Sequence, residues 1–321
     1  MLCYNFGMSK PKLALLSDVQ GWAFCQQMHD LELYLSDRFD VAHLYVFDWV
    51  VRNQIVPNLA AFDVVYCPYH RWHIERYLPW DRTLGSLRAQ WLVPENKRTP
   101  QAEEFAIVNR FRAFNVVNRA NFDEYKPGCP NLYYLTNPVN MRRFQATPRR
   151  NEVIASWNGN AGHSNALEED VKGFYSIVHP ACKRAGVELR YAEYETCRKA
   201  PHEMPEFYQQ ANLAMSASLY EGASSSVMEA LAAGLAAIVT DCGNHREMQQ
   251  AQLEKYGETG IRIVERTVDA FVRELTVLKQ DPDLVYEMGQ LNRRSIAEDW
   301  SWDVWADPFA RFLSIPVEQR P

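Results

Sequence analysis

Two glutamates and a run of small residues in the second half of the chain could together hold a polar ligand. Residues 213–218 form an apolar run typical of a strand, Glu221 follows its end, and Glu229 lies one turn into an expected helix. Carboxylates accept hydrogen bonds from hydroxyl groups, so both side chains suit a ligand rich in hydroxyls. Taken alone, two glutamates in this arrangement are more typical of a helix cap and a solvated helix face.

The residues between the two glutamates suit an anion. Gly222, Ala223, Ser224, Ser225 and Ser226 are all small, and they leave the backbone N–H groups at the start of the next helix uncovered. The first amides of a helix have no intrahelical acceptor, and the helix dipole favours a negative charge there. We therefore expect these five residues to bind an anionic group such as a diphosphate.

The longer motifs around these residues resemble glycosyltransferase family 4. Residues 218–222 read Ser-Leu-Tyr-Glu-Gly and residues 227–234 read Val-Met-Glu-Ala-Leu-Ala-Ala-Gly, which keeps the family's pattern of two glutamates with seven residues between them. Three further segments are similar to those that flank this motif in the family: 204–208, 238–244 and 256–260. The resemblance is specific over this part of the chain and weaker elsewhere.

The resemblance implies a retaining glycosyltransferase that moves a sugar from a nucleotide sugar to a hydroxyl acceptor. The nucleotide sugar is expected to be a UDP-sugar, and neither a metal ion nor a permanently bound cofactor is expected. Glu221 would be the catalytic residue that holds the hydroxyls of the donor sugar. Glu229 would hold the ribose.

Further donor-binding residues follow from the same resemblance. Lys172 matches a lysine that binds the diphosphate in the family, whereas Asn160 stands where the family often has arginine. His163, in the loop after Asn160, is a second candidate for contact with phosphate. Gly21 and Trp22 lie where the family's N-terminal glycine loop approaches the donor phosphates.

The acceptor side is less well defined. A histidine of the N-terminal half often lies near the transferred sugar in this family, and we assign His70 to that position, with His29 as another candidate. Basic residues interleaved with tryptophan and tyrosine suit a nucleic acid backbone and a stacked base. The same residues could instead pack their stems against the core and pair with nearby acids. The residues predicted to bind the acceptor are Arg71, His73, Arg76 and Arg98.

Several functions remain open at this point. The acceptor could be a hydroxymethylated or hydroxylated pyrimidine base in DNA, as in a phage-type DNA glycosyltransferase. A nucleotide-sugar epimerase of the same fold would need no acceptor. A non-catalytic nucleotide-sugar-binding protein would bind the donor without turnover. Fold likeness alone does not separate these functions.

Strand-like and helix-like segments alternate along the chain. Residues 12–17 and 41–47 form apolar runs of strand length, and between them residues 22–38 carry apolar side chains at three- and four-residue spacing. Residues 90–93 are expected to form a strand and residues 171–185 a helix. Alternation of this kind predicts an α/β fold of parallel sheets covered by helices.

With the resemblance, the expected fold is GT-B, with two Rossmann-like doubly wound domains that face a cleft. Residues 1–147 would form the acceptor-binding domain and residues 148–296 the donor-binding domain. Residues 297–321 would form a helix that packs back on the first domain. Ligands of such sheets bind beyond the carboxyl ends of the strands.

Composition agrees with a folded chain of two domains, because 47% of its 321 residues are hydrophobic. The net charge of −6 is uneven, with +4 on residues 1–150 and −10 on the remainder, which is a weak indication of an anionic partner for the first half. Seven scattered cysteines indicate reduced thiols, and no apolar run reaches the length of a membrane span. We therefore expect a cytoplasmic protein without a signal peptide or transmembrane segment.

Overall fold

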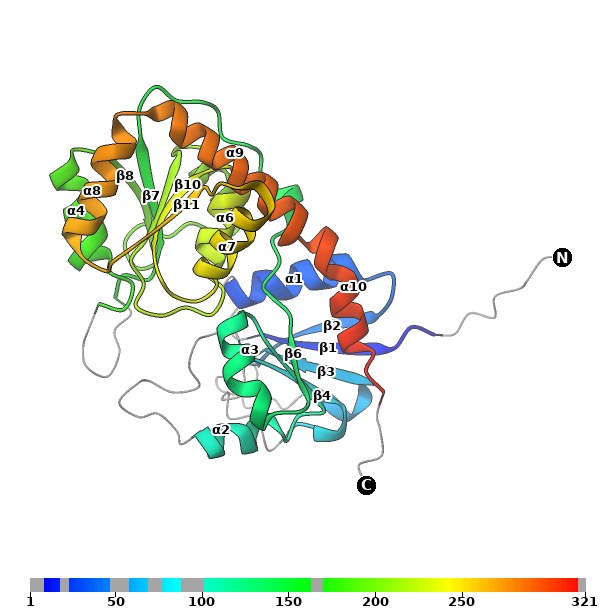
Figure 1. The fold of residues 1–321 in the computed structure, drawn as a ribbon. Helices are drawn as coiled ribbons and strands as arrows, with labels where there is room; N and C mark the ends of the chain where they lie inside the picture. The colour runs from blue at the N-terminus through cyan, green and yellow to red at the C-terminus, as the bar shows by residue number, and fades with distance from the viewer. Residues whose placement is uncertain are drawn as a thin grey trace.

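The computed structural model describes residues 9–17, 23–46, 58–68, 77–87, 101–162 and 170–316. In this part of the chain, two parallel β-sheets follow one another in sequence, and helices pack against both (Figure 1). Every strand pair in both sheets is parallel. The α/β fold expected from the alternating pattern is therefore confirmed.

The first sheet has six strands in the order β2-β1-β3-β4-β5-β6. Its central strands are buried on both faces, between two apolar clusters. Helix α1 buries Met28, Leu31 and Leu35 against this sheet. The elements are β1 Lys12–Ser17, α1 Ala23–Leu35, β2 Asp40–Tyr45, β3 Val64–Cys67, β4 Thr83–Leu87, α2 Gln101–Val108, β5 Ala113–Val116, α3 Arg119–Tyr125 and β6 Leu132–Tyr134, with short 3-10 turns at Leu59–Ala61, Trp80–Arg82, Lys126–Gly128 and Met141–Arg143.

The second sheet has five strands in the order β11-β10-β9-β7-β8. An apolar layer lies on each face of this sheet, and helices pack against both layers. The elements are β7 Ile154–Gly159, a π-helical turn Phe174–Val178, α4 His179–Ala185, β8 Glu188–Glu193, α5 Met204–Tyr208, β9 Leu213–Ser216, α6 Ser225–Ala232, β10 Ala236–Thr240, α7 His245–Tyr256, β11 Ile261–Val264, α8 Val268–Lys279 and α9 Pro282–Asp299.

The last helix, α10 (Trp302–Leu313), leaves the second sheet and packs on the first. Trp302, Phe309, Phe312 and Leu313 are buried in the same apolar cluster as residues of β1 and α1. In Figure 1, α9 and α10 run from one sheet to the other in orange and red. This crossing agrees with the expected C-terminal helix. No helix in the described parts of the chain is both long and apolar enough to cross a membrane.

The two connections between the halves lie side by side. Val139 follows β6, and its N–H donates to Trp300 O over 2.9 Å, while Trp302 N–H donates to Val139 O over 3.0 Å. The first connection thus runs parallel to the junction of α9 and α10 and is hydrogen-bonded to it. The residues assigned to each domain from the sequence remain a prediction.

Two segments differ from the expected pattern. The helix predicted over residues 171–185 begins later, because Gly173 adopts a left-handed conformation with φ of +66° and the following turn is π-helical. Residues 83–87 form β4, although the sequence suggested no element there. The strand expected over residues 90–93 lies outside the described residues.

Candidate functional site

The second sheet changes strand order at β7, which has β8 on one side and β9 on the other. In open parallel sheets, ligands bind beyond the carboxyl ends of the strands at such a switch point. The loops after β7 and β9 leave the sheet here, and they carry Lys172 and Glu221 respectively. The candidate site is therefore built at the place where topology predicts a ligand.

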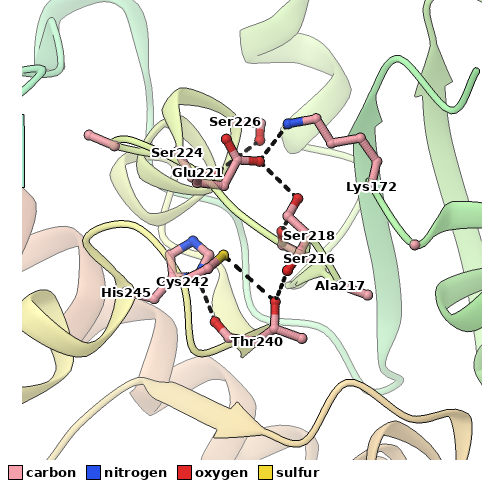
Figure 2. A network of polar contacts seen from close by, with 12 residues as sticks. Lys172, Ser216, Ala217, Ser218, Glu221, Ser224, Ser226, Thr240, Cys242 and His245 are labelled. Atoms are coloured by element: carbon pink, nitrogen blue, oxygen red, sulfur yellow. Dashed lines mark hydrogen bonds and ion pairs between the residues drawn. The ribbon is translucent and has the colours of Figure 1, made fainter. Parts of the chain in front are cut away.

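Lys172 and Glu221 form an ion pair at this edge (Figure 2). Lys172 Nζ donates to Glu221 Oε1 over 2.6 Å, and Ser218 Oγ donates to the same oxygen over 2.8 Å. The lysine side chain is 26% exposed and the glutamate side chain 16% exposed, so both reach solvent. The structure thus brings together two residues that lie 49 positions apart.

Backbone contacts hold the two loops against each other. Leu219 N–H donates to Val171 O over 2.8 Å. Arg266, from the segment between β11 and α8, donates through Nε to Ala217 O over 2.9 Å and through Nη2 to Asp170 O. The position of Lys172 relative to Glu221 is therefore fixed by the backbone as well as by the ion pair.

Buried polar residues lie beneath Glu221 (Figure 2). Thr240 Oγ1 donates to Ser218 O over 2.6 Å, and the Nδ1 atom of fully buried His245 lies 2.8 Å from Thr240 O. Burial lowers the pKa of His245, although Thr240 O and Glu221 oppose this shift. Burial also raises the pKa of the Cys242 thiol to about 12, which favours the protonated thiol at neutral pH.

Glu221 is ionised at neutral pH. Burial acts to raise its pKa, but the charge of Lys172 and hydrogen bonds from Lys172 and Ser218 outweigh it and hold the pKa below the ordinary value. An ionised carboxylate accepts hydrogen bonds only, which suits sugar hydroxyls. Lys172 presents an ammonium group that can also contact an incoming phosphate.

Glu229, in α6, belongs to a second polar cluster that spans both halves of the molecule. Its Oε1 lies 3.3 Å from Arg143 Nη1, and its Oε2 lies 3.4 Å from Tyr208 Oη. Arg143 Nη1 also lies 3.8 Å from Asp30 Oδ2, on α1 of the first half. Burial raises the pKa of Glu229, and the charge of Arg143 offsets only part of this effect. Two carboxylates thus share one guanidinium group.

The start of α6 is partly engaged by the protein. Ser224 N–H donates to Asn244 Oδ1 over 3.3 Å, so this amide is less available to a diphosphate than the sequence suggested. Ser225 Oγ accepts from Gln27 Nε2 of α1 over 2.7 Å. Ser224 makes no side-chain capping bond to the first turn, and the backbone amides of Ser225 and Ser226 remain candidates for anion binding.

Two asparagines of the first half hold the loop before α6. Asn118, after β5, donates to Gly222 O over 3.0 Å, and Asn137, after β6, donates to Ala223 O over 3.4 Å. Both asparagines follow strand ends of the first sheet, and the loop follows a strand end of the second. The carboxyl edges of the two sheets therefore face each other across the site.

Asn160 shapes the loop after β7. Its Oδ1 accepts from Gly162 N–H over 2.9 Å, and the nearby Glu193, which is buried, accepts from Ala161 N–H over 3.2 Å. Backbone and side-chain donors around Glu193 lower its pKa although burial opposes them. Asn160 thus has a structural contact in place of the charge that arginine would supply.

Several predicted site residues lie outside the described residues. They are Gly21, Trp22, His70, Arg71, His73, Arg76, Arg98 and His163. His29 is described, and it lies on α1 near Tyr45 and Glu32. Among the described basic residues near the aromatic stretch, Arg110 stacks over Trp80 at 3.9 Å and Arg82 pairs with Asp81 at 3.1 Å.

Sequence reasoning missed Asp30, Arg143, Tyr208 and Arg266. Tyr208 lies in the flanking segment 204–208, but no role was assigned to it, and the other three are common residue types outside the segments named for the resemblance. Only the fold brings them to the site. Asn118 directly follows the apolar pair Val116 and Val117, and Asn137 follows the run 132–135 after a single threonine, which is the one local signal that could have pointed to strand ends facing a ligand.

Comparison with known proteins identifies a domain in the second half. Residues 196–295 match the family described as glycosyl transferases group 1, and this segment contains both Glu221 and Glu229. A putative glycosyltransferase, EpsD of Bacillus subtilis, is 28% identical over 118 residues, which cover 36% of this chain and 30% of the relative. This part of the chain is therefore similar to glycosyl transferases group 1, and the aligned part spans less than a third of this relative.

Solved structures show the same fold over nearly the whole chain. Anabaena HepE in complex with UDP and glucose has a TM-score of 0.69 at 11% identity, covering 95% of this chain and 100% of that one. Sucrose-phosphate synthase from Thermosynechococcus elongatus has a TM-score of 0.67 at 11% identity, covering 94% and 98%. The expected GT-B fold is confirmed.

Proposed function

We propose that this protein is a retaining glycosyltransferase that takes a UDP-sugar as donor and transfers its sugar to a hydroxyl acceptor. The observation that carries the proposal is the Lys172–Glu221 pair, 2.6 Å apart, at the strand switch point of a glycosyl transferases group 1 domain. HepE, which has the same fold, is described in complex with UDP-glucose. That likeness supports UDP as the nucleotide.

In this proposal different residues of the chain bind different parts of the donor. Glu221 accepts hydrogen bonds from the sugar hydroxyls, and Glu229 accepts from the ribose, displacing Arg143 as its partner. As the bond from the anomeric carbon to the diphosphate breaks, negative charge grows on the diphosphate. The acceptor oxygen bonds to that carbon, and its proton passes to the departing phosphate oxygen. Lys172 and the amides of Ser225 and Ser226 stabilise this charge.

Donor binding is tested first, by isothermal titration of UDP, UDP-glucose and GDP-mannose into the protein. We expect the UDP compounds to bind and Glu229→Gln to weaken binding at least about tenfold, because hydrogen bonds to a charged acceptor contribute about 1.5–3 kcal/mol. Glu206→Gln is the matched control, since Glu206 is exposed on α5 of the same half. Absence of binding for all three compounds contradicts the proposal.

Reaction type is tested without knowledge of the acceptor. Proton NMR is used to monitor the slow transfer of glucose from UDP-glucose to water. If the configuration is retained, α-glucose appears first, before mutarotation. First appearance of β-glucose contradicts retention. Conversion of the nucleotide sugar into an isomer would identify an epimerase, and binding without turnover would identify a non-catalytic protein.

The acceptor is then sought among hydroxyl compounds, with hydroxymethylated DNA as one member of the panel. A sugar-sized mass gain on the modified base would identify a DNA glycosyltransferase. Among the described residues, Arg110 stacks over Trp80 and Arg82 pairs with Asp81, and the residues predicted to bind the acceptor lie outside the described parts of the chain.

A further inference from the structure

Three side chains of metal-binding type meet on the outer part of the first sheet. His29 and Glu32 lie one turn apart on α1, and His43 lies on the edge strand β2. Each offers a ligand atom, and these atoms lie within 4.8 Å of one another. The three residues belong to elements other than those that carry Lys172 and Glu221.

The spacing is close to that of a bound ion. His29 Nδ1 lies 3.8 Å from Glu32 Oε2, and the His29 and His43 rings are 4.5 Å apart between centroids. Ligand atoms of a tetrahedral zinc ion lie roughly 3.3 Å apart, given bonds of about 2.0–2.2 Å. The side chains of His29 and Glu32 are 44% and 40% exposed, so small rotations can close the difference.

His43 has the surroundings of a metal ligand. Its Nε2 lies 2.7 Å from Ser17 Oγ, whereas its Nδ1 is buried and has no hydrogen-bond partner in the described part of the chain. Metal-binding histidines commonly donate a hydrogen bond from the N–H of their second ring nitrogen to such an outer partner, and this bond fixes the tautomer. A neutral ring that donates from Nε2 to Ser17 keeps a lone pair on Nδ1, and leaving a buried polar atom unpaired is unfavourable.

We propose that His29, Glu32 and His43 bind one divalent ion of the zinc class, with water completing its coordination. Two imidazoles and a carboxylate are a ligand set that suits zinc and its neighbours in the transition series. The ion ties α1 to β2. The other side of α1 carries Gln27 and Asp30, which contact Ser225 and Arg143, so the ion steadies the helix that bears these contacts. Its role is structural and independent of sugar transfer.

Cobalt provides a direct test, because Co²⁺ substitutes for zinc and its visible absorption reports the coordination geometry. Tag-free protein is titrated with Co²⁺ and the bound ion is then displaced with Zn²⁺. We expect one Co²⁺ per chain, and an affinity at least about tenfold lower in His29→Ala and in Glu32→Gln. Ser17→Ala keeps all three ligands, and we expect it to weaken binding by about 10–100-fold through loss of the outer hydrogen bond.

His202→Ala is the matched control, because His202 is an exposed histidine outside the cluster. His29 and Glu32 are also at the surface, so their variants are expected to fold, and circular dichroism checks this. Equal Co²⁺ titrations for wild type, His29→Ala and Glu32→Gln overturn the proposal. A cobalt–thiolate charge-transfer band also overturns it, since it would place the ion on a cysteine. Neither readout depends on a nucleotide sugar.

Discussion

At the scale of single residues, the ionisation of Glu221 depends on Lys172. Burial favours the protonated carboxylic acid, and the lysine reverses this preference. A buried carboxylate that loses its cationic partner has its pKa raised. The lysine therefore has two functions in the proposed reaction, one toward the diphosphate and one toward Glu221.

Lys172→Met is expected to reduce turnover and to move the acid limb of the pH profile of kcat/KM to higher pH. The direction follows from the burial of Glu221, which remains when the ammonium group is gone and then raises the pKa above its ordinary value. UDP release measured across the acidic range checks this. Lys183→Met, at an exposed position of α4, is the control. An unchanged acid limb would show that Glu221 ionisation does not control the rate.

The resemblance assigned Lys172, Glu221 and Glu229 to the donor site from the order of residue types around them, and these roles stay predictions. The partners of Glu229 could not be found in this way. Arg143 lies 86 positions from Glu229 in the connection between the halves, and nothing in its neighbours marks it. Contacts of this length depend on how the two sheets face each other, which local sequence does not specify.

At the scale of elements, Gly173 is required where the loop after β7 turns into the π-helical segment. A Cβ atom at this position would lie 2.5 Å from Ala217 O, and φ is +66°. Gly173→Ala therefore must displace the backbone that carries Lys172. We expect loss of UDP-sugar binding and a decrease in the free energy of unfolding of more than about 1 kcal/mol.

Gly257→Ala separates these two effects. Gly257 has a φ of +78° at the end of α7, but an added Cβ would meet nothing within 4 Å. Alanine at this position therefore has an unfavourable φ but no steric clash. We expect Gly257→Ala to lower the free energy of unfolding without weakening the binding of UDP-glucose. Urea unfolding together with UDP-glucose titration of both variants gives the comparison. Equal donor affinity in Gly173→Ala and Gly257→Ala would show that the loop tolerates the displacement.

Some strands are easier to predict from the sequence than others. Strand β1 is a continuous apolar run and was predicted with its exact bounds, Lys12–Ser17. Strand β4, Thr-Leu-Gly-Ser-Leu, has only two large apolar residues, so it carries little signal of its own. It is buried because the rings of Phe111 and Phe114 cover Gly85, where a Cβ atom would lie 2.3 Å from the nearer ring. Its burial therefore comes from residues that follow it by more than twenty positions.

At the scale of the whole molecule, the two ends of the chain share one core. Phe309 of α10 is fully buried beside Leu13 and Leu15 of β1. Residues 1–147 alone would leave this part of the first sheet uncovered. The core of the first half thus includes a helix that follows the second half in the sequence.

Phe309→Ala is expected to lower the free energy of unfolding by about 3–5 kcal/mol, as is usual for removal of a fully buried phenylalanine. Val304→Ala, on the same helix at a side chain that is 43% exposed, should change it by less than about 0.5 kcal/mol. Urea unfolding followed by tryptophan fluorescence measures both. Similar midpoints for the two variants would mean that α10 contributes little to the stability of the first half.

The two connections between the halves, at Val139 and Trp300, lie side by side and are hydrogen-bonded to each other. A rotation of one half about these connections would change the other contacts between the halves, among them those of Arg143 with Asp30 and Glu229. A donor ribose that takes Glu229 from Arg143 alters this link between the halves before any acceptor arrives. We therefore expect an ordered kinetic scheme. The nucleotide sugar binds first, and the acceptor then binds to a surface whose arrangement depends on the bound donor.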